Sequence, residues 1–361
     1  MRFCFCVVAL IFLAGCGNFS KDVVWYRGNT HTHTTLCGHA DTVPDIVAKW
    51  YLDNDYNFVI LSEHNLFIDP KTVNLPVDRR KDFILVPGQE VTGRRGIHTT
   101  AMNVQKIIPW HFNNKEKWKI IQSHVDHTHA ANGQTILNHP NFGKSLRAAD
   151  LLKVKKLYFF ELYNGHPHVL NNGDKETAST GEIWDELLSA GLPIYGVSSD
   201  DAHTFKKLSN KLSNPGRGWV MVNSQGSLTP DALTNAMVAG QFYSSNGIFL
   251  KRCEKDHHSY SIEVDHERTM KEISKGHVSG KFVNKNAEDG YLIEFISDGG
   301  KVLHSVKGKS AEFNVPKGIS YLRTRITLTR MEGNKKEQFF AWGQPIFLDG
   351  RSVNTHSSHS K

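Results

Sequence analysis

Histidines near the start of the chain have the spacing of metal ligands. His31 and His33 are separated by one residue, and His39 follows just after a glycine. Because side chains alternate across a β-strand, His31 and His33 would lie on one face, close enough to share one cation. A single H-x-H pair is weak evidence, since many such pairs lie on surfaces without an ion. Three histidines in nine residues is nevertheless dense, even for a chain with 20 histidines, and predicts a metal site.

Later segments repeat one design, in which a short apolar run leads into a residue able to bind metal. The runs at residues 58–61, 83–86, 135–137 and 194–197 lead to His64, Glu90, His139, and the pair Asp201 and His203. A run at residues 157–160 leads into Glu161 in the same way. Such runs are typical of strands buried on both faces of a parallel sheet. In a parallel α/β barrel all strand ends meet at one rim, so these side chains are expected to converge.

The motifs H-x-H, C-G-H, S-E-H, G-x-E, N-H-P and D-x-H follow one another in the order typical of a known family. This order resembles the PHP (polymerase and histidinol phosphatase) superfamily of metal-dependent phosphoesterases, over roughly residues 25 to 250. The C-G-H-A form of the second motif is similar to the histidinol-phosphatase type. The resemblance implies an α/β fold, a distorted (β/α)7 barrel with two or three divalent ions (Zn, Mn or Fe) at its rim.

Carried over residue by residue, the resemblance implies a set of metal ligands. They are His31, His33, His39, His64, Glu90, His98, His139, Asp201 and His203. The first ion would have His31, His33, Glu90 and Asp201. The second would share Glu90 and add His98 and His139. The third would have His39, His64 and His203.

Three of these assignments have open alternatives. Glu63 stands where an aspartate is common and is either a ligand or a neighbour of one. Asp200 adjoins Asp201, which is preferred because it forms D-x-H with His203. His98 is either a ligand or a histidine bonded to the backbone at a strand end.

The implied chemistry is hydrolysis. Divalent ions that share a water lower its pKa from about 15.7 toward 7, which provides hydroxide for in-line attack on phosphorus. The sequence thus predicts an enzyme that cleaves a small phosphomonoester or phosphodiester. The predicted catalytic residues are Glu90, His139, Asp201 and His203. The candidate substrate-binding residues, each of which is also typical of a solvated surface, are Arg94, Arg95, Lys144, Arg147, His166 and Arg217.

Two other function classes stay open. One is a related metallohydrolase of carboxylic or carbamate esters. The other is a non-catalytic lipoprotein in which metal stabilises the fold. The net charge of +7 is dispersed, which suits a small anionic substrate and argues against a nucleic-acid partner, whose binding would need clustered Lys and Arg.

The N-terminus resembles a bacterial lipoprotein signal. Arg2 precedes an apolar stretch at residues 3–13, and Leu13-Ala14-Gly15-Cys16 resembles a lipobox. This implies a lipid anchor on Cys16 and a place in the cell envelope, in the outer membrane facing the periplasm or cell surface. An uncleaved anchor is the alternative, but the stretch is short for a span of about 20 residues.

After the signal peptide and linker, residues 1–20, two folded units are expected from 361 residues. The barrel would occupy residues 21–252, with helices at 44–53, 118–131 and 183–190. The histidines His124, His127 and His129 of the second helix are expected to be solvated. Alternating residues from 253 to 349 predict a small all-β sandwich, and residues 350–361 a disordered tail. The two cysteines beyond the signal, Cys37 and Cys253, favour no disulfide, and Cys37 is either a metal thiolate or, as favoured here, a buried structural thiol.

Overall fold

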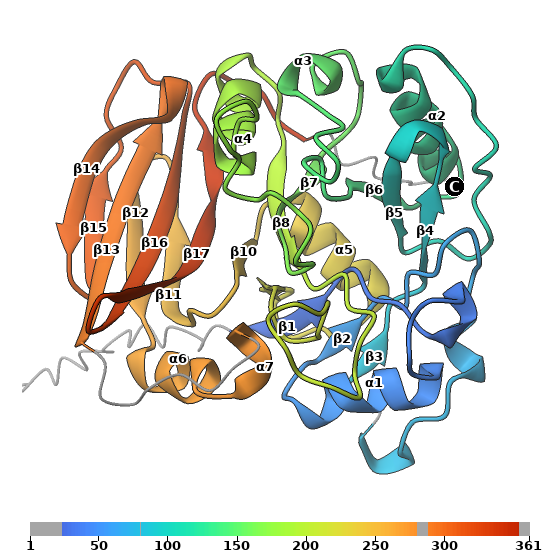
Figure 1. Ribbon diagram of the computed structural model, residues 1–361. Helices are drawn as coiled ribbons and strands as arrows, with labels where there is room; N and C mark the ends of the chain where they lie inside the picture. Colours follow the sequence, from blue (N-terminus) through green and yellow to red (C-terminus); the bar gives the residue numbers. More distant parts are fainter. Residues whose placement is uncertain (1–23, 80, 280–287, 354–361) are drawn as a thin grey trace, which may run out of the picture.

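Three β-sheets form the framework of the protein (Figure 1). The computed structural model describes residues 24–79, 81–279 and 288–353. The predicted lipobox with Cys16 and the end of the predicted tail lie outside these residues. No helix in the described ranges is long and apolar enough to cross a membrane.

The largest sheet has nine strands and is mostly antiparallel. In spatial order they are β14 (Lys301–Lys307), β13 (Glu288–Ser297), β16 (Tyr321–Glu332), β17 (Lys335–Phe347), β10 (Phe242–Ser245), β9 (Trp219–Val222), β1 (Tyr26–Asn29), β2 (Phe58–Val59) and β3 (Ile84–Leu85). The pairs β1–β2 and β2–β3 are parallel, and the other pairs are antiparallel. The H-x-H segment follows the end of β1, which is the third strand from the β3 edge of this sheet.

The second sheet has five strands and carries most of the carboxylates of interest. Its strands are β4 (Gly88–Thr92), β5 (His98–Met102), β6 (Gln134–Leu137), β7 (Phe159–Asn164) and β8 (Tyr195–Ser199). The first three pair antiparallel and the last three pair parallel. A third, antiparallel sheet consists of β11 (Leu250–Lys255), β12 (Ser259–Val264) and β15 (Ser310–Asn314).

The predicted (β/α)7 barrel is wrong, because the strands form separate sheets of mixed direction. Where β8 passes β10, side chains replace the backbone ladder that a closed barrel needs. Ser198 Oγ donates to the carbonyl of Ser245 at 2.8 Å, and Ser244 Oγ donates to the carbonyl of Gly196 at 2.7 Å. Gln344 also bonds both backbone groups of Gly196, at 3.0 and 2.8 Å.

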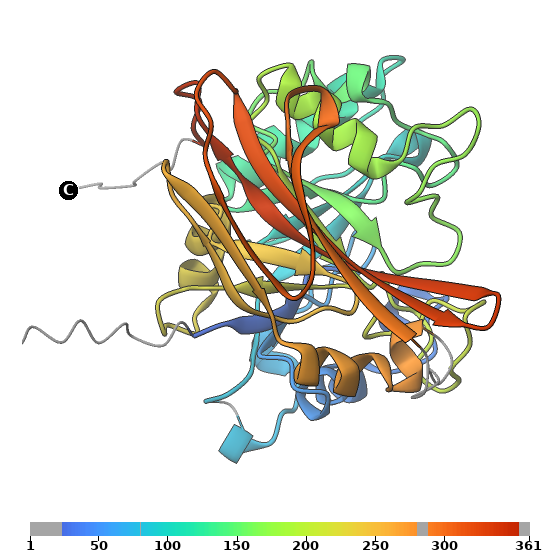
Figure 2. The ribbon, with the colours of Figure 1, turned by 90° about the vertical axis from the view of Figure 1, so that its left-hand side faces the viewer.

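The predicted separate sandwich is not seen either. The long strands β16 and β17 cross the face shown in Figure 2. They belong to the same sheet as β1, because β17 pairs with β10 at its C-terminal half. The fold is therefore a set of three sheets rather than a barrel followed by a sandwich, and the division at residue 253 stays a prediction.

Short helices cover the sheets. They are α1 (Pro44–Asp53), α2 (Lys117–Ala130), α3 (Ala148–Leu151), α4 (Thr180–Ser189), α5 (Pro230–Val238), α6 (His266–Ile273) and α7 (Gly276–Ser279). The predicted bounds of α1 are confirmed: Pro44 occupies its first turn, and Val47 and Tyr51 bury one face. Helix α4 begins with a capping box between Ser179 and Glu182.

Gly28 lies in the interior of β1, where no side chain fits. A Cβ there would lie 2.0 Å from Cζ of Phe58, its buried partner on β2. Gly28→Ala is therefore expected to lower the free energy of unfolding by about 3 kcal/mol, measured by urea denaturation, because the packed ring has nowhere to go. Gly290→Ala on β13, where nothing lies within 4 Å, is the matched control and should change it by less than about 0.5 kcal/mol. Equal effects would contradict this account.

Candidate metal centre

The H-x-H segment lies between two other strand ends, held by backbone hydrogen bonds. The N–H of Asp201 donates to His31 O, that of His33 to Ala202 O, and that of Ser62 to Thr32 O, each at 2.9 Å. The nine-stranded and five-stranded sheets therefore meet here, although they do not close into a barrel. The convergence of strand ends that the sequence predicts thus arises from a different architecture.

His31 and His33 lie close together, as the alternation of a strand predicts. Their Nε2 atoms are 3.1 Å apart, and both side chains are fully buried. Two imidazole nitrogens at this separation, inside the protein, are placed to bind the same cation.

Glu90 on β4 is the carboxylate that most histidines approach. Its oxygens lie near His64 Nδ1 (2.6 Å), His98 Nδ1 (3.2 Å), His31 Nε2 (3.3 Å), His139 Nε2 (3.5 Å) and His33 Nε2 (3.6 Å). Asn138 Nδ2 also donates to Oε1 at 2.9 Å. Because its two oxygens face different histidines, Glu90 has the position of a bridging ligand.

Asp201 is the second carboxylate of the cluster. Its Oδ1 lies 3.3 Å from Nε2 of both His31 and His33 and 3.7 Å from Nδ1 of His203. Its Oδ2 lies 4.0 Å from His139 Nε2. Asp201 and His139 both have positive φ, 49° and 23°, a strained backbone that is common at functional sites.

The structure brings all the predicted ligands into one cluster. Overlapping groups whose ligand atoms lie within 4.8 Å of one another are His31, His33 and Asp201; His31, Glu90 and His139; His33, His64 and His203; and Cys37, His39 and His203. His98 joins through its contact with Glu90. That these residues bind metal stays a prediction.

The cluster holds its carboxylates as anions. Burial raises the pKa of Glu90, but His31 and His98 outweigh it and hold the pKa well below its usual value. Burial also raises the pKa of Asp201, but His31 and the other nearby histidines hold that pKa well below its usual value. Burial lowers the pKa of His31, yet Asp201 and Glu161 raise it well above its usual value. The site therefore attracts positive charge, for which protons and metal ions compete.

Several buried atoms of the cluster have no hydrogen-bond partner among the described residues. They are His33 Nδ1, Glu63 Oε2, Glu90 Oε2, His98 Nδ1, His139 Nδ1 and His203 Nε2. Buried polar atoms without partners are costly and uncommon. Imidazole nitrogens and carboxylate oxygens are ligands that zinc, manganese and iron accept, so the residues present fit divalent cations.

Glu161 was not among the predicted site residues, yet it orients the cluster. Its Oε1 accepts from His31 Nδ1 at 2.8 Å, which leaves the Nε2 lone pair of His31 facing Glu90 and Asp201. Its Oε2 accepts from the backbone N–H of His139 at 2.7 Å. The apolar run that leads into Glu161 was the signal that could have identified it.

Asp200, the alternative to Asp201, has a different role. Its carboxylate accepts from the backbone N–H groups of Gly216, Arg217 and Gly218, at 2.9, 2.6 and 2.7 Å. The hydroxyl of Tyr51 donates to it at 2.8 Å. Asp200 therefore holds the chain that follows β8, and Asp201 faces the cluster. Glu63, the other open case, accepts from Thr34 N–H at 2.6 Å and lies 3.8 Å from His33 Nδ1.

The cationic side chains proposed to bind phosphate are placed less favourably. Arg94, Arg95 and Arg147 are exposed, and no hydrogen bond or ion pair among the described residues joins them to the cluster. Lys144 pairs with Asp174 and Glu176, at 2.7 and 3.3 Å.

Arg217 is buried and already occupied. It donates to the carbonyl oxygens of Ser209 and Leu212 and to Asn214 Oδ1. It therefore holds the loop at residues 209–214 instead of reaching for an anion.

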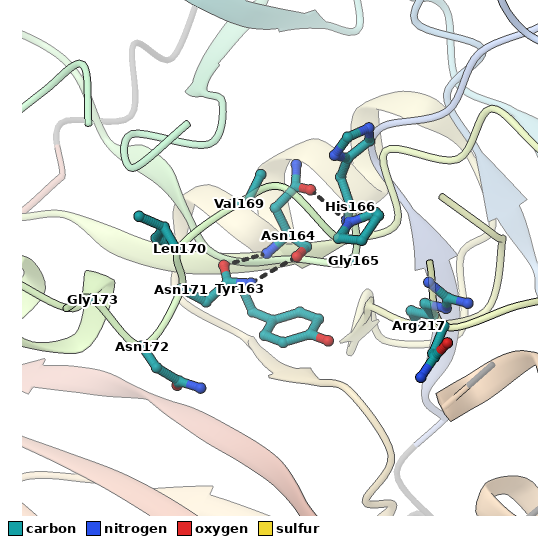
Figure 3. A pocket seen from close by; sticks show the side chains of 12 residues that line it. Tyr163, Asn164, Gly165, His166, Val169, Leu170, Asn171, Asn172, Gly173 and Arg217 are labelled. Carbon is teal, nitrogen blue, oxygen red and sulfur yellow. Dashed lines mark hydrogen bonds between the residues drawn. The ribbon is translucent and has the colours of Figure 1, made fainter. Parts of the chain in front are cut away.

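Figure 3 shows the residues that line a cavity of about 370 Å³. His166, Tyr163 and Arg217 line it, and Asn164 joins it to the cluster by donating to Glu161 Oε2 at 2.7 Å. The ring of His166 lies 6.0 Å from that of His203, measured between centroids. His166 is thus the predicted substrate-binding residue that both lines this cavity and approaches a predicted ligand.

His124 on α2 is a buried histidine outside the cluster, where the sequence predicts a solvated one. Its side chain is fully buried, and Nδ1 lies 3.1 Å from Thr99 Oγ1. Burial, with a smaller effect of His98, lowers the pKa of His124 to about 3. Since the unfolded chain binds this proton near pH 6.5, the folded state is fully stable above that pH and loses stability as the pH falls toward 3.

Because of His124, the free energy of unfolding is expected to be about 2 kcal/mol lower at pH 5 than at pH 7. In His124→Gln, the free energy of unfolding should fall less between pH 7 and pH 5, as measured by urea denaturation at the two pH values. His127→Gln, on the exposed face of the same helix, is the matched control and should keep the full decrease. The same acid loss in both variants would exclude His124 as its source.

Comparison with known proteins adds no identification. No protein-family model matches the chain, and the search of curated proteins found no match.

Proposed function

We propose that this protein is a metal-dependent hydrolase, a phosphoesterase that cleaves a small phosphomonoester or phosphodiester. The observation that supports it best is the position of Glu90, whose carboxylate lies within 3.6 Å of ring nitrogens of His31, His33, His64, His98 and His139. So many histidines around one buried carboxylate are costly for a purely structural role, since several of their ring nitrogens have no hydrogen-bond partner among the described residues.

The residues that would hold ions form three groups. One is His31, His33, Glu90 and Asp201; the second is Glu90, His98 and His139; the third is His39, His64 and His203. Zn, Mn or Fe bound there would supply Lewis acidity and a nucleophile at neutral pH. The sequence resemblance to the PHP superfamily supports the same assignment.

His166 is the residue best placed to act on the leaving group. Its Nδ1 accepts from the backbone N–H of His168 at 3.2 Å, so in the neutral ring the proton is on Nε2. Burial lowers the pKa of His166, which keeps the ring neutral at pH 7. A neutral Nε2–H beside the cavity can donate a hydrogen bond to the ester oxygen and so stabilise the negative charge that builds on it as the bond breaks.

One observation favours a second function, hydrolysis of carboxylic or carbamate esters. The cationic candidates for phosphate binding are paired, occupied or exposed away from the cluster, as described for Lys144, Arg217 and Arg94. A neutral ester would not need them. The resemblance of residues 13–16 to a lipobox supports a place in the cell envelope for either activity.

Hydrolysis of matched aryl esters by the purified protein distinguishes these functions. With Mn²⁺ or Zn²⁺ bound, we expect the protein to release p-nitrophenol from p-nitrophenyl phosphate or from bis(p-nitrophenyl) phosphate. Chelation of the ions should abolish this activity. Release from p-nitrophenyl acetate alone would favour the second function. Silence on all three esters, with two or more ions bound per chain, would indicate a non-catalytic binding lipoprotein.

A further inference from the structure

Cys37 lies beside the third group of predicted ligands. Its Sγ and one ring nitrogen each of His39 and His203 are within 4.8 Å of one another. A second such group joins the same Cys37 to His33 and Glu63. His33 Nδ1 and Glu63 Oε2 are fully buried and have no hydrogen-bond partner among the described residues. The thiol therefore lies beside two buried polar atoms that are 3.8 Å apart and have no hydrogen bond among the described residues.

The backbone around Cys37 is built to present the thiol and His39 together. A short turn, η1 (Thr35–Cys37), is capped by Thr34, whose hydroxyl accepts from Leu36 N–H at 3.3 Å. Gly38 then adopts φ of 83°, a left-handed conformation that side chains disfavour. This reversal brings His39 back toward the cluster, where its ring lies 4.6 Å from that of His203.

Both histidines beside the thiol have one nitrogen engaged by the backbone. His203 Nδ1 lies 2.9 Å from the carbonyl of Asp201, and His39 Nδ1 lies 3.2 Å from the carbonyl of Cys37. A proton on Nδ1 leaves Nε2 with a lone pair, and His203 Nε2 is buried without a hydrogen-bond partner. This arrangement, with the second nitrogen bonded to a carbonyl, is the usual one for metal-binding histidines.

We propose that the Cys37 thiolate is a further metal ligand, which with His39 and His203 makes a zinc-selective site beside the Glu90 centre. On binding, the thiol loses its proton to solvent and sulfur bonds to the ion. Thiolate and imidazole together favour zinc, whereas the carboxylate-rich groups also accept manganese. This inference rests on the proposed metal centre, but it concerns which ion the third group takes.

Cobalt substitution tests the thiolate directly. Co²⁺ bound by a thiolate gives a sulfur-to-metal charge-transfer band in the near ultraviolet, which imidazole and carboxylate ligands lack. We expect this band when Co²⁺ is added to the purified protein, its loss in Cys37→Ser, and its retention in Cys253→Ser, the matched control. In Cys37→Ser, Zn²⁺ binding at one site should weaken at least about 10-fold, while Mn²⁺ binding changes less than about 2-fold.

The outcomes separate this inference from the proposed function. If Co²⁺ binds without the band, Cys37 is not a ligand, and the Glu90 centre stands. If no Co²⁺ binds, the metal centre and this inference both fail. Far-ultraviolet circular dichroism of Cys37→Ser verifies its fold, and in a folded variant an unchanged band would also overturn the proposal.

Discussion

Glu90→Gln is expected to remove at least one bound ion per chain and to lower hydrolysis by more than about 100-fold. Residues that only orient ligands typically cost 10 to 100-fold when changed, and Glu90 has the position of a shared ligand. Glutamine has nearly the same shape, so the expected effect comes from the lost negative charge among His31, His98 and His139. Elemental analysis of the purified variant measures the ions, and aryl ester hydrolysis measures the rate.

The matched control for this prediction is Glu294→Gln. Glu294 is also a buried glutamate on a strand, but it pairs with Arg325 at 2.8 Å on the neighbouring strand. It should keep the full complement of ions and the wild-type rate. A Glu90→Gln protein with all its ions would show that the carboxylate is not a ligand.

Glu272→Gln is expected to lower the free energy of unfolding by about 3 to 5 kcal/mol, because it leaves a buried guanidinium without its counter-charge. Glu272 on α6 accepts from Arg27 on β1 at 2.8 Å, and Arg27 is 1% exposed. The guanidinium also lies between the rings of Tyr56 and Trp219, 3.9 and 4.0 Å from their centroids. Urea denaturation of the two proteins measures the loss.

Two further variants test the cause of this loss. Arg27→Met combined with Glu272→Leu removes both charges and should recover most of the stability. Asp53→Asn removes the partner of Lys49 in an exposed pair and should cost less than about 0.5 kcal/mol. If the double variant is as unstable as Glu272→Gln, packing rather than charge explains the loss.

The pairing of Arg27 with Glu272 also predicts how the stability of the protein depends on pH. Burial raises the pKa of Glu272, but Arg27 outweighs it, and the net pKa lies far below its usual value. The stabilisation is therefore complete above the unfolded pKa of about 4.3 and is lost as the pH falls below it. Glu272→Gln should accordingly lose less stability than the wild type between pH 5 and pH 2.

The site was more predictable from the sequence than the architecture around it. The candidate ligand Glu90 comes soon after the apolar run at residues 83–86, so a local pattern was enough to mark it, although it lies within β4 and not at a strand end. Strand direction depends on partners far along the chain. Strand β9 (Trp219–Val222) is buried throughout, as a parallel strand would be, yet it pairs antiparallel with β1 and β10. An apolar run therefore did not distinguish a barrel from stacked sheets.

Side-chain roles that depend on distant partners were also missed. Glu161 supports His31 from 130 positions away in the sequence. Arg217 had the charge of an anion-binding residue, but the carbonyl groups that occupy it come from a loop with no distinctive pattern. Composition and spacing identify which residues are able to act, whereas the contacts of the fold decide which are free to do so.

The meeting of two sheets at the cluster has a consequence for the lifetime of the protein. His31, His33 and His64 follow strands of the nine-stranded sheet, whereas Glu90, His98 and Asp201 lie on or after strands of the five-stranded sheet. Ions bound between them would link the two sheets, and each ion would stabilise the folded state more as its concentration rises above its dissociation constant. The supply of metal would then set how readily proteases degrade the protein.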